Sequence, residues 1–288
     1  MKGIILAGGT GSRLFPATIA TCKQLLPVYD KPLVYYPLDT LIQAGISEIL
    51  LISTPTHLPF FKNLFGDGKT LGISMQYASQ DKPNGIAEAL LIGEKFIDND
   101  SVVLILGDNI FYGKDLINTI LQKQNNFQGA LTFACKVENP NRFGVVCFDD
   151  KGDIAEIVEK PMVAPSDYAV IGIYVLDSKA SYFAKQLKPS QRNELEITDL
   201  QNIYLQQKQL NVHLLPADFV WFDAGNADSL FQAACWVKTT EERIKQKIGA
   251  VEISAYQQGY ISSNTLFYRG KQMENSEYGK YLIHFSKQ

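Results

Sequence analysis

The sequence has few of the residues that build metal and disulfide sites. Only three of its 288 residues are histidines (His57, His213 and His284), and its four cysteines lie far apart. It contains no C-x-x-C pair, and no histidine neighbours a cysteine. We therefore expect neither a histidine-rich metal site, nor a zinc site, nor a small disulfide framework.

The sequence also lacks a long hydrophobic run and a strong charge of either sign. No apolar run approaches the length of a transmembrane helix, and the first apolar strand starts so close to Met1 that no signal peptide is expected. A formal net charge of −3 gives no general attraction to nucleic acid or to an anionic membrane. We expect a soluble, cytoplasmic globular protein that binds neither of them.

A glycine-rich turn follows the first predicted strand, residues 3–7. Its glycines can take positive φ and let N–H groups converge on an anion. Arg13 adds a planar fork for phosphate oxygens, and Lys23 adds a mobile point charge. This pattern favours a nucleotide-using enzyme. The alternative is a tight strand-to-helix turn that needs glycine only for its geometry.

Two named phosphate motifs fail on spacing. A dinucleotide fingerprint needs a third glycine, but the pattern here runs Gly9-x-Gly11-x-x-Leu14. A Walker motif needs a lysine directly after its last glycine, and none is present. A nicotinamide-dependent oxidoreductase therefore stays only a remote alternative.

The first half of the chain alternates predicted strands with predicted helices. The strands are near-continuous apolar runs, which suit a sheet covered on both faces. This favours an α/β fold with a doubly wound, mostly parallel, Rossmann-like sheet. The predicted strands are residues 3–7, 48–53, 74–79 and 102–106, and the predicted helices are residues 32–44, 57–65, 85–96 and 114–125.

The middle of the chain reads differently. Short links join predicted strands at residues 130–137, 144–148, 154–159 and 169–175, so antiparallel pairing is expected. From residue 227 the pattern is helical through residue 248, with another helix at 253–258. We predict one catalytic core over residues 1–226 and a C-terminal helical extension over residues 227–288.

Polar side chains follow several of the predicted strands. The glycine turn, Gln80 and Asp108 all come after strand ends, where ligands bind in open α/β sheets. The carboxylate of Asp108 suits Mg²⁺, although a turn aspartate that bonds its own backbone is the alternative. Asp223 is a candidate second ligand. The neighbouring Glu159 and Lys160 are either a binding pair or a solvated ion pair at a strand end.

Together these segments resemble the sugar nucleotidyltransferases, and within them the thymidylyltransferase branch. The resemblance runs from Lys2 to about Tyr281. The segment at residues 23–32 favours the thymidylyl branch over the uridylyl and cytidylyl branches. The segments that carry it are residues 8–14, 23–32, 107–109, 159–161, 194–199 and 221–223.

The resemblance implies a role for each matching residue. The nucleotide part, about residues 1–128, would bind dTTP through Gly8, Gly9, Gly11, Ser12, Arg13, Lys23, Gln24, Gln80, Gly85 and Asp108. The sugar part, about residues 129–226, would bind glucose 1-phosphate through Gly144, Glu159, Lys160, Val170, Tyr174 and Arg192. Asp108 and Asp223 would hold Mg²⁺, and the implied catalytic set is Arg13, Lys23, Asp108, Lys160 and Asp223.

The implied reaction is an Mg²⁺-dependent in-line transfer of a thymidylyl group to glucose 1-phosphate, which would begin dTDP-sugar synthesis, such as that of dTDP-rhamnose for lipopolysaccharide O-antigen. A sugar phosphate has a second pKa of about 6, so its oxygen needs no general base, and scarce histidine is expected. The resemblance also implies a homo-oligomer, a tetramer or a dimer. Phe143, Ile171, Asn193 and Ala224 depart from the family pattern. UTP or another hexose 1-phosphate therefore stays open as substrate, as does an inactive regulatory homologue.

Overall fold

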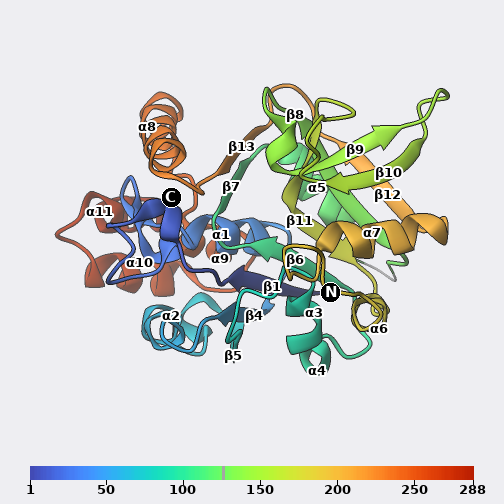
Figure 1. Ribbon diagram of the computed structural model, residues 1–288. Helices are drawn as coiled ribbons and strands as arrows, with labels where there is room; N and C mark the ends of the chain where they lie inside the picture. Colours follow the sequence, from blue (N-terminus) through green and yellow to red (C-terminus); the bar gives the residue numbers. More distant parts are fainter. Residues whose placement is uncertain (125–126) are drawn as a thin grey trace.

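The computed structural model describes residues 1–124 and 127–288. Its centre is a nine-stranded mixed sheet with helices on both faces (Figure 1). Along the main path the strands run β10 (Ile154–Glu159), β9 (Gly144–Phe148), β11 (Tyr168–Leu176), β6 (Val102–Leu106), β1 (Lys2–Ala7), β4 (Glu48–Ser53) and β5 (Ser74–Ser79). β8 (Ala130–Lys136) pairs with β11, and β12 (Leu210–Leu214) pairs with β8.

The half of the sheet from β6 to β5 is parallel, as predicted. Successive residues of β1 point to opposite faces, so Ile4 and Ile5 belong to two different hydrophobic clusters. The Ile5 side is covered by α1 (Tyr35–Gln43) and α2 (Leu58–Phe65). The Ile4 side is covered by α3 (Glu88–Ile92) and α4 (Glu94–Ile97). This burial on both faces explains why β1, β4 and β6 are largely apolar, whereas the edge strand β5 is more polar and partly exposed.

Several predicted helices differ from the structure at their bounds, and the one expected over residues 227–248 ends at Ile244. The helix expected over residues 85–96 was wrong as one element, because Gly93 separates α3 from α4 where a Cβ would meet Ile4 Cδ1 at 2.8 Å. The helix expected from residue 32 begins at Tyr35, since Lys31–Pro32 forms β3 and pairs with β2 (Pro27–Val28). α5 (Lys114–Gln122) ends earlier than expected, and predicted residue 125 lies outside the described residues.

The other half of the sheet is antiparallel around β11, which confirms the expectation for the middle of the chain. The register of β11 on β8 shifts between Val170 and Tyr174. The turn between β9 and β10 is held by Asp149, whose carboxylate accepts hydrogen bonds from two backbone N–H groups. α6 (Ala180–Ala184) and α7 (Ile197–Gln206) cover the face of this half that continues from α3.

A second, two-stranded sheet lies beside the first. β7 (Asn109–Tyr112) leaves the end of β6 and pairs antiparallel with β13 (Val220–Asp223). From β13 the chain enters α8 (Ala227–Ile244), whose start is fixed by a reciprocal cap between Asn226 and Ser229. This small sheet therefore brings the end of the core chain back to the residue that follows Asp108.

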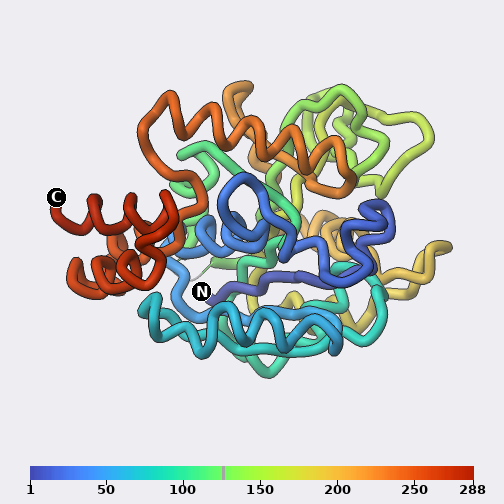
Figure 2. Tube along the Cα trace, turned by 90° about the vertical axis from the view of Figure 1, so that its left-hand side faces the viewer, coloured from blue at the N-terminus to red at the C-terminus, as the bar shows by residue number. Residues whose placement is uncertain are grey.

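The last three helices pack against α1 at one end of the molecule (Figure 2). They are α9 (Val251–Gln257), α10 (Ser263–Gln272) and α11 (Glu277–Phe285), and their apolar residues join the same cluster as α1. Buried polar contacts fix the docking: Ser254 Oγ donates to Asp39 Oδ1 at 2.6 Å, and the Tyr278 hydroxyl donates to Glu252 at 2.6 Å. Within the described part of the chain, the helices are all too short or too polar to span a membrane.

Candidate functional site

The glycine turn lies directly after β1, at the carboxyl end of the parallel strands. Gly9 and Gly11 have positive φ, 94° and 61°, which glycine adopts without strain. Thr18 Oγ1 donates to Gly11 O at 2.8 Å, and a Cβ on Gly11 would lie 3.2 Å from the Thr18 side chain. Ser12 and Arg13 start the short 3-10 helix that follows and are exposed. The Arg13 guanidinium is thus accessible at the mouth of the turn.

Lys23 and Asp108 meet behind this turn. Lys23 Nζ forms an ion pair with Asp108 Oδ2, and both side chains are mostly buried. The other carboxylate oxygen, Asp108 Oδ1, accepts from Asn109 Nδ2 at 2.9 Å. Asn109 is itself fixed by the Trp221 indole N–H, which donates to Asn109 Oδ1 at 2.7 Å. Both oxygens of Asp108 are therefore held in place.

The small sheet places Asp223 beside Asp108. Asp223 pairs in register with Asn109, and Ala224 N–H donates to Asp108 O at 3.1 Å. Burial and then the charge of Asp108 raise the pKa of Asp223, while the positive charges of Lys23, Arg13 and Arg142 oppose this rise. Four of the five predicted catalytic residues, Arg13, Lys23, Asp108 and Asp223, thus share one electrostatic environment.

The pair of carboxylates fits a hard divalent cation. Each is an oxygen donor of the kind that Mg²⁺ prefers, and Mg²⁺ takes one or two protein carboxylates and completes its shell with water and phosphate oxygens. Burial is the main cause of the raised pKa of Asp223 and the charge of Asp108 adds to it, and a bound cation would oppose both effects. Over residues 1–124 and 127–288, no group of three or more His, Cys, Asp or Glu residues is placed to hold a metal ion by itself.

Gln24 and Gln80, two of the residues predicted to bind dTTP, both lie close to Gly8. Gln24 Nε2 donates to Gly8 O at 3.1 Å, while Gln24 Oε1 is buried without a partner in the described chain. Gln80 lies on the other side, and a Cβ on Gly8 would come 2.7 Å from Gln80 Oε1. Gly85 (φ 109°) packs so tightly on Leu195 that a Cβ would lie 2.3 Å from Leu195 O. The structure thus brings Gln24 and Gln80 together at the glycine turn and anchors the loop that carries Gly85.

The predicted sugar residues gather on the antiparallel half. Gly144 pairs with Glu159 in register, and a Cβ on Gly144 would lie 3.5 Å from Glu159 Oε2. Lys160 has a left-handed backbone (φ 42°) fixed by its N–H, which donates to Phe143 O at 2.9 Å. Its Nζ lies 3.2 Å from Glu159 Oε1. The backbone strain at Lys160 falls on a residue that sequence reasoning already placed in the site.

Arg192 forms ion pairs with three glutamates, one of which is Glu159. Its Nη2 lies 3.0 Å from Glu159 Oε1, 3.3 Å from Glu194 Oε2 and 2.7 Å from Glu196 Oε2. Burial raises the pKa of the Tyr174 hydroxyl, and the charges of Glu159 and Asp108 raise it further. Val170 is buried on the same strand as Tyr174. The two halves of the candidate site meet where the Phe143 ring, next to Gly144, packs on the Trp221 ring, with 4.8 Å between the ring centroids.

Sequence reasoning assigned no role to several side chains of this region. Arg142 stacks over the Phe143 ring and reaches to 4.0 Å from Asp223 Oδ2. Asn109 and Glu88 hold Asp108 and Gln80 through hydrogen bonds. The only sequence signal for Asn109 and Arg142 was their position beside Asp108 and Phe143, and Glu88 gave none.

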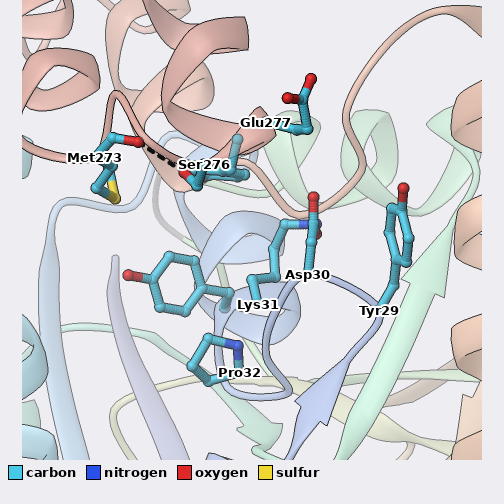
Figure 3. Close-up of a pocket in the computed structure, with 9 residues that line it drawn as sticks. Tyr29, Asp30, Lys31, Pro32, Met273, Ser276 and Glu277 are labelled. Atoms are coloured by element: carbon cyan, nitrogen blue, oxygen red, sulfur yellow. Dashed lines mark hydrogen bonds and ion pairs between the residues drawn. The ribbon is translucent and has the colours of Figure 1, made fainter.

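A separate pocket of about 350 Å³ lies between the β2–β3 turn and the C-terminal helices (Figure 3). One wall of the pocket is formed by Tyr29, Asp30 and Lys31. The start of α11, with its cap residue Ser276 and its first residue Glu277, lies opposite. Lys31 is buried, pairs with Asp30 at 2.6 Å, and lies over the Tyr278 ring. The pocket is lined by none of the predicted site residues.

Comparison with known proteins agrees with this geometry. A family model for nucleotidyl transferases matches residues 2–240. The chain is 48% identical over 284 residues to a glucose-1-phosphate thymidylyltransferase from Neisseria gonorrhoeae, covering 99% of each chain. It is 49% identical over 283 residues to one from Mycolicibacterium smegmatis, covering 98% of each.

Solved structures give the same result. A Bacillus anthracis crystal structure, assigned as a glucose-1-phosphate thymidylyltransferase and in complex with sucrose, superposes with a TM-score of 0.76 at 44% identity. That match covers 82% of this chain and 94% of the other. A UDP-glucose pyrophosphorylase complexed with UDP-glucose superposes with a TM-score of 0.73 at 25% identity, covering 83% and 98%.

Proposed function

The chain belongs to the nucleotidyl transferase family, in its glucose-1-phosphate thymidylyltransferase branch, and we propose that it transfers a thymidylyl group from dTTP to α-D-glucose 1-phosphate. The products would be dTDP-glucose and pyrophosphate. The observation that carries the proposal is the contact between the sugar side and the nucleotide side of the site. The Phe143 ring, next to Gly144, packs on the Trp221 ring with 4.8 Å between the centroids, and Trp221 holds Asn109 beside Asp108. An acceptor phosphate bound near Glu159 would therefore approach the triphosphate directly.

The chemistry needs no protein base. The sugar phosphate has a second pKa of about 6, so its oxygen is ionised at neutral pH. That oxygen would form a bond to the α-phosphorus while the bond to the bridging oxygen of the β-phosphate breaks, and pyrophosphate would leave with the electron pair. Catalysis then consists of holding the two phosphates in line and neutralising the charge that accumulates.

We propose that cationic side chains supply much of this neutralisation. Arg13 is exposed at the mouth of the glycine turn, where it can approach the triphosphate. Lys23 would move from Asp108 to a phosphate oxygen when dTTP binds. Lys160 and Arg192 would take the acceptor phosphate, because each now rests on Glu159 and can exchange a carboxylate for a phosphate.

We propose that Asp108 and Asp223 hold Mg²⁺. When bound there, the ion would supply positive charge to the phosphate oxygens of dTTP. Asn109 would keep Asp108 turned toward that position through its hydrogen bond to Oδ1. The three cations near Asp223 would prevent the two carboxylates from repelling each other fully while no metal is bound.

The test is a pyrophosphate-release matrix with Mg²⁺. It crosses dTTP, UTP and dCTP with glucose 1-phosphate, galactose 1-phosphate and mannose 1-phosphate. We expect the highest kcat/KM for dTTP with glucose 1-phosphate. Turnover that is highest with UTP or with another hexose 1-phosphate would replace the proposed substrates, and no pyrophosphate release in any combination would support an inactive regulatory homologue.

We propose in addition that dTDP-glucose made here begins dTDP-sugar synthesis, such as that of dTDP-rhamnose for surface polysaccharide, and that the chain forms a homo-oligomer. The match to the glucose-1-phosphate thymidylyltransferase branch supports the proposed pathway. The oligomeric state has to be measured. Light scattering of the purified protein would decide between a dimer, a tetramer and a monomer. Loss of dTDP-rhamnose from cells that lack the chain would support the pathway.

A further inference from the structure

The amide of Gln80 is held in one orientation by two acceptors. Gln80 is buried at the end of β5, and its Nε2 donates to Glu88 Oε2 at 2.7 Å and to Gly85 O at 3.2 Å. Both neighbours are oxygens that only accept, so the nitrogen of the amide must face them. This commits both hydrogens of Nε2. The only hydrogen-bonding group of Gln80 left for a ligand is the acceptor Oε1.

Gln80 Oε1 points toward the glycine turn. A Cβ on Gly8 would lie 2.7 Å from this oxygen, and only a glycine at this position avoids the contact. Gln24 also contacts Gly8, and its own amide oxygen, Oε1, is buried without a partner in the described chain. The group that Gln80 offers beside Gly8 is therefore an acceptor, and a ligand there has to bring a donor.

Glu88 is itself fixed. Its second oxygen, Oε1, accepts from Asn84 Nδ2 at 2.8 Å. The loop between Gln80 and Glu88 is tied to the segment before α7, because Leu195 N–H donates to Asn84 O at 2.6 Å and Ala87 N–H donates to Leu195 O at 3.2 Å. The carboxylate therefore cannot turn away from Gln80 without breaking contacts on both sides of the loop.

We propose that Glu88 is a positioning residue that selects the nucleobase by locking the Gln80 amide with its oxygen toward the cleft. This deepens, and rests on, the proposed thymidylyl transfer. Thymine and uracil carry a hydrogen on N3 and can donate to Gln80 Oε1. Cytosine has a bare acceptor at N3, which would face another acceptor and leave both without a partner. Glu88 would thus exclude cytosine nucleotides without touching the base.

The test compares kcat/KM for dTTP and dCTP in three proteins with glucose 1-phosphate as acceptor. Glu88→Ala removes the shorter of the two hydrogen bonds that hold Gln80 Nε2 and leaves only the one to Gly85 O, so the amide can turn over more easily. The dTTP-to-dCTP ratio should therefore fall by about tenfold or more, mainly through a higher KM for dTTP. Glu88→Gln keeps an acceptor for Gln80 Nε2, so its ratio should stay within about threefold of the wild type. The KM for glucose 1-phosphate should change little in either variant.

Each outcome bears on one claim. An unchanged ratio in Glu88→Ala, or an equal loss in Glu88→Gln, would overturn the role of Glu88. If Glu88→Ala does not fold, Asn84→Ala releases the same carboxylate from its other side, and its ratio should fall by about threefold; an unchanged ratio there would also overturn the proposal. A wild-type protein that does not use dTTP would instead refute the proposed function.

Discussion

Lys23 and Asp108 form a mostly buried ion pair across 85 positions of the sequence. The lysine therefore occupies an oxygen of the carboxylate that we assign to Mg²⁺. Lys23 and a metal ion would compete for the same carboxylate when no nucleotide is bound. Bound dTTP would end this competition, because a phosphate oxygen would then pair with Lys23. Lys23 therefore offsets the charge of Asp108 in the structure.

Replacing Lys23 by Met should separate these two roles. The rate of pyrophosphate release should fall by at least about a hundredfold, because a donor aimed at the developing charge is lost. Mg²⁺ binding to the nucleotide-free protein, measured by calorimetry, should become tighter, because a competing positive charge is gone. Lys69→Met is the matched control, since Lys69 is exposed and pairs only with Asp67. Weaker Mg²⁺ binding in Lys23→Met would contradict the shared carboxylate.

Asp108 and Asp223 should act as one unit. Asp108→Asn and Asp223→Asn should each lower kcat by about a hundredfold or more, and the double variant should lose little more than either single one. The reason is that removing one ligand already disables a shared cation. Asp218→Asn, an exposed aspartate near β13, serves as control. Multiplicative losses in the double variant would show that the two carboxylates work separately.

Gly144 should control the sugar side through its lack of a side chain. A Cβ there would lie 2.8 Å from Thr198 Cγ2, and it would also approach Glu159. Gly144→Ala should therefore raise the KM for glucose 1-phosphate by about tenfold, with a small change in the KM for dTTP. Adding Thr198→Ser removes the clashing methyl group and should restore much of the loss. A double variant as weak as Gly144→Ala would place the damage elsewhere.

The sequence predicted the central strands well for a physical reason. A parallel strand buried on both faces must be largely apolar, and β4 and β6 match their predicted bounds. The edge strand β5 also matches its predicted bounds, although it is partly exposed. The contacts of the site could not be predicted in this way. That Asp223 meets Asp108 depends on the pairing of β7 with β13, which joins segments more than a hundred residues apart. Only the family resemblance placed them together.

The predicted helical extension over residues 227–288 includes the last two helices, but their bounds could not be predicted because their signal is tertiary. α10 contains Gly270, which disfavours a helix taken alone. In the structure α10 crosses α11 at two glycines, and a Cβ on Gly270 would lie 2.9 Å from Gly279 O. Glycine is needed there for close approach of the two backbones. Local propensity and packing thus oppose each other at this position, and packing prevails.

Asp39 should make the docking of the C-terminal helices depend on pH. Burial raises its pKa to about 6, although Ser254 and Gln43 donate hydrogen bonds to it and Lys31 lies near; the charge of Glu252 adds to the rise. The folded state therefore binds a proton more tightly than the unfolded state, where an aspartate has a pKa of about 3.9. The stabilisation is fully present below about pH 4 and is lost as the pH rises through about 6.

Asp39→Asn should remove this dependence, because its amide resembles the protonated acid and does not titrate. Between pH 4 and pH 7 the free energy of unfolding of the wild type, relative to the variant, should fall by about 2 kcal/mol, since each unit of pKa shift corresponds to about 1.4 kcal/mol. Urea titrations at both pH values measure it, with Asp218→Asn as the exposed control. If the difference in the free energy of unfolding between wild type and Asp39→Asn is the same at both pH values, Asp39 does not change its charge on folding. The hydrogen bonds from Ser254 and Gln43 would then offset the cost of burying the carboxylate.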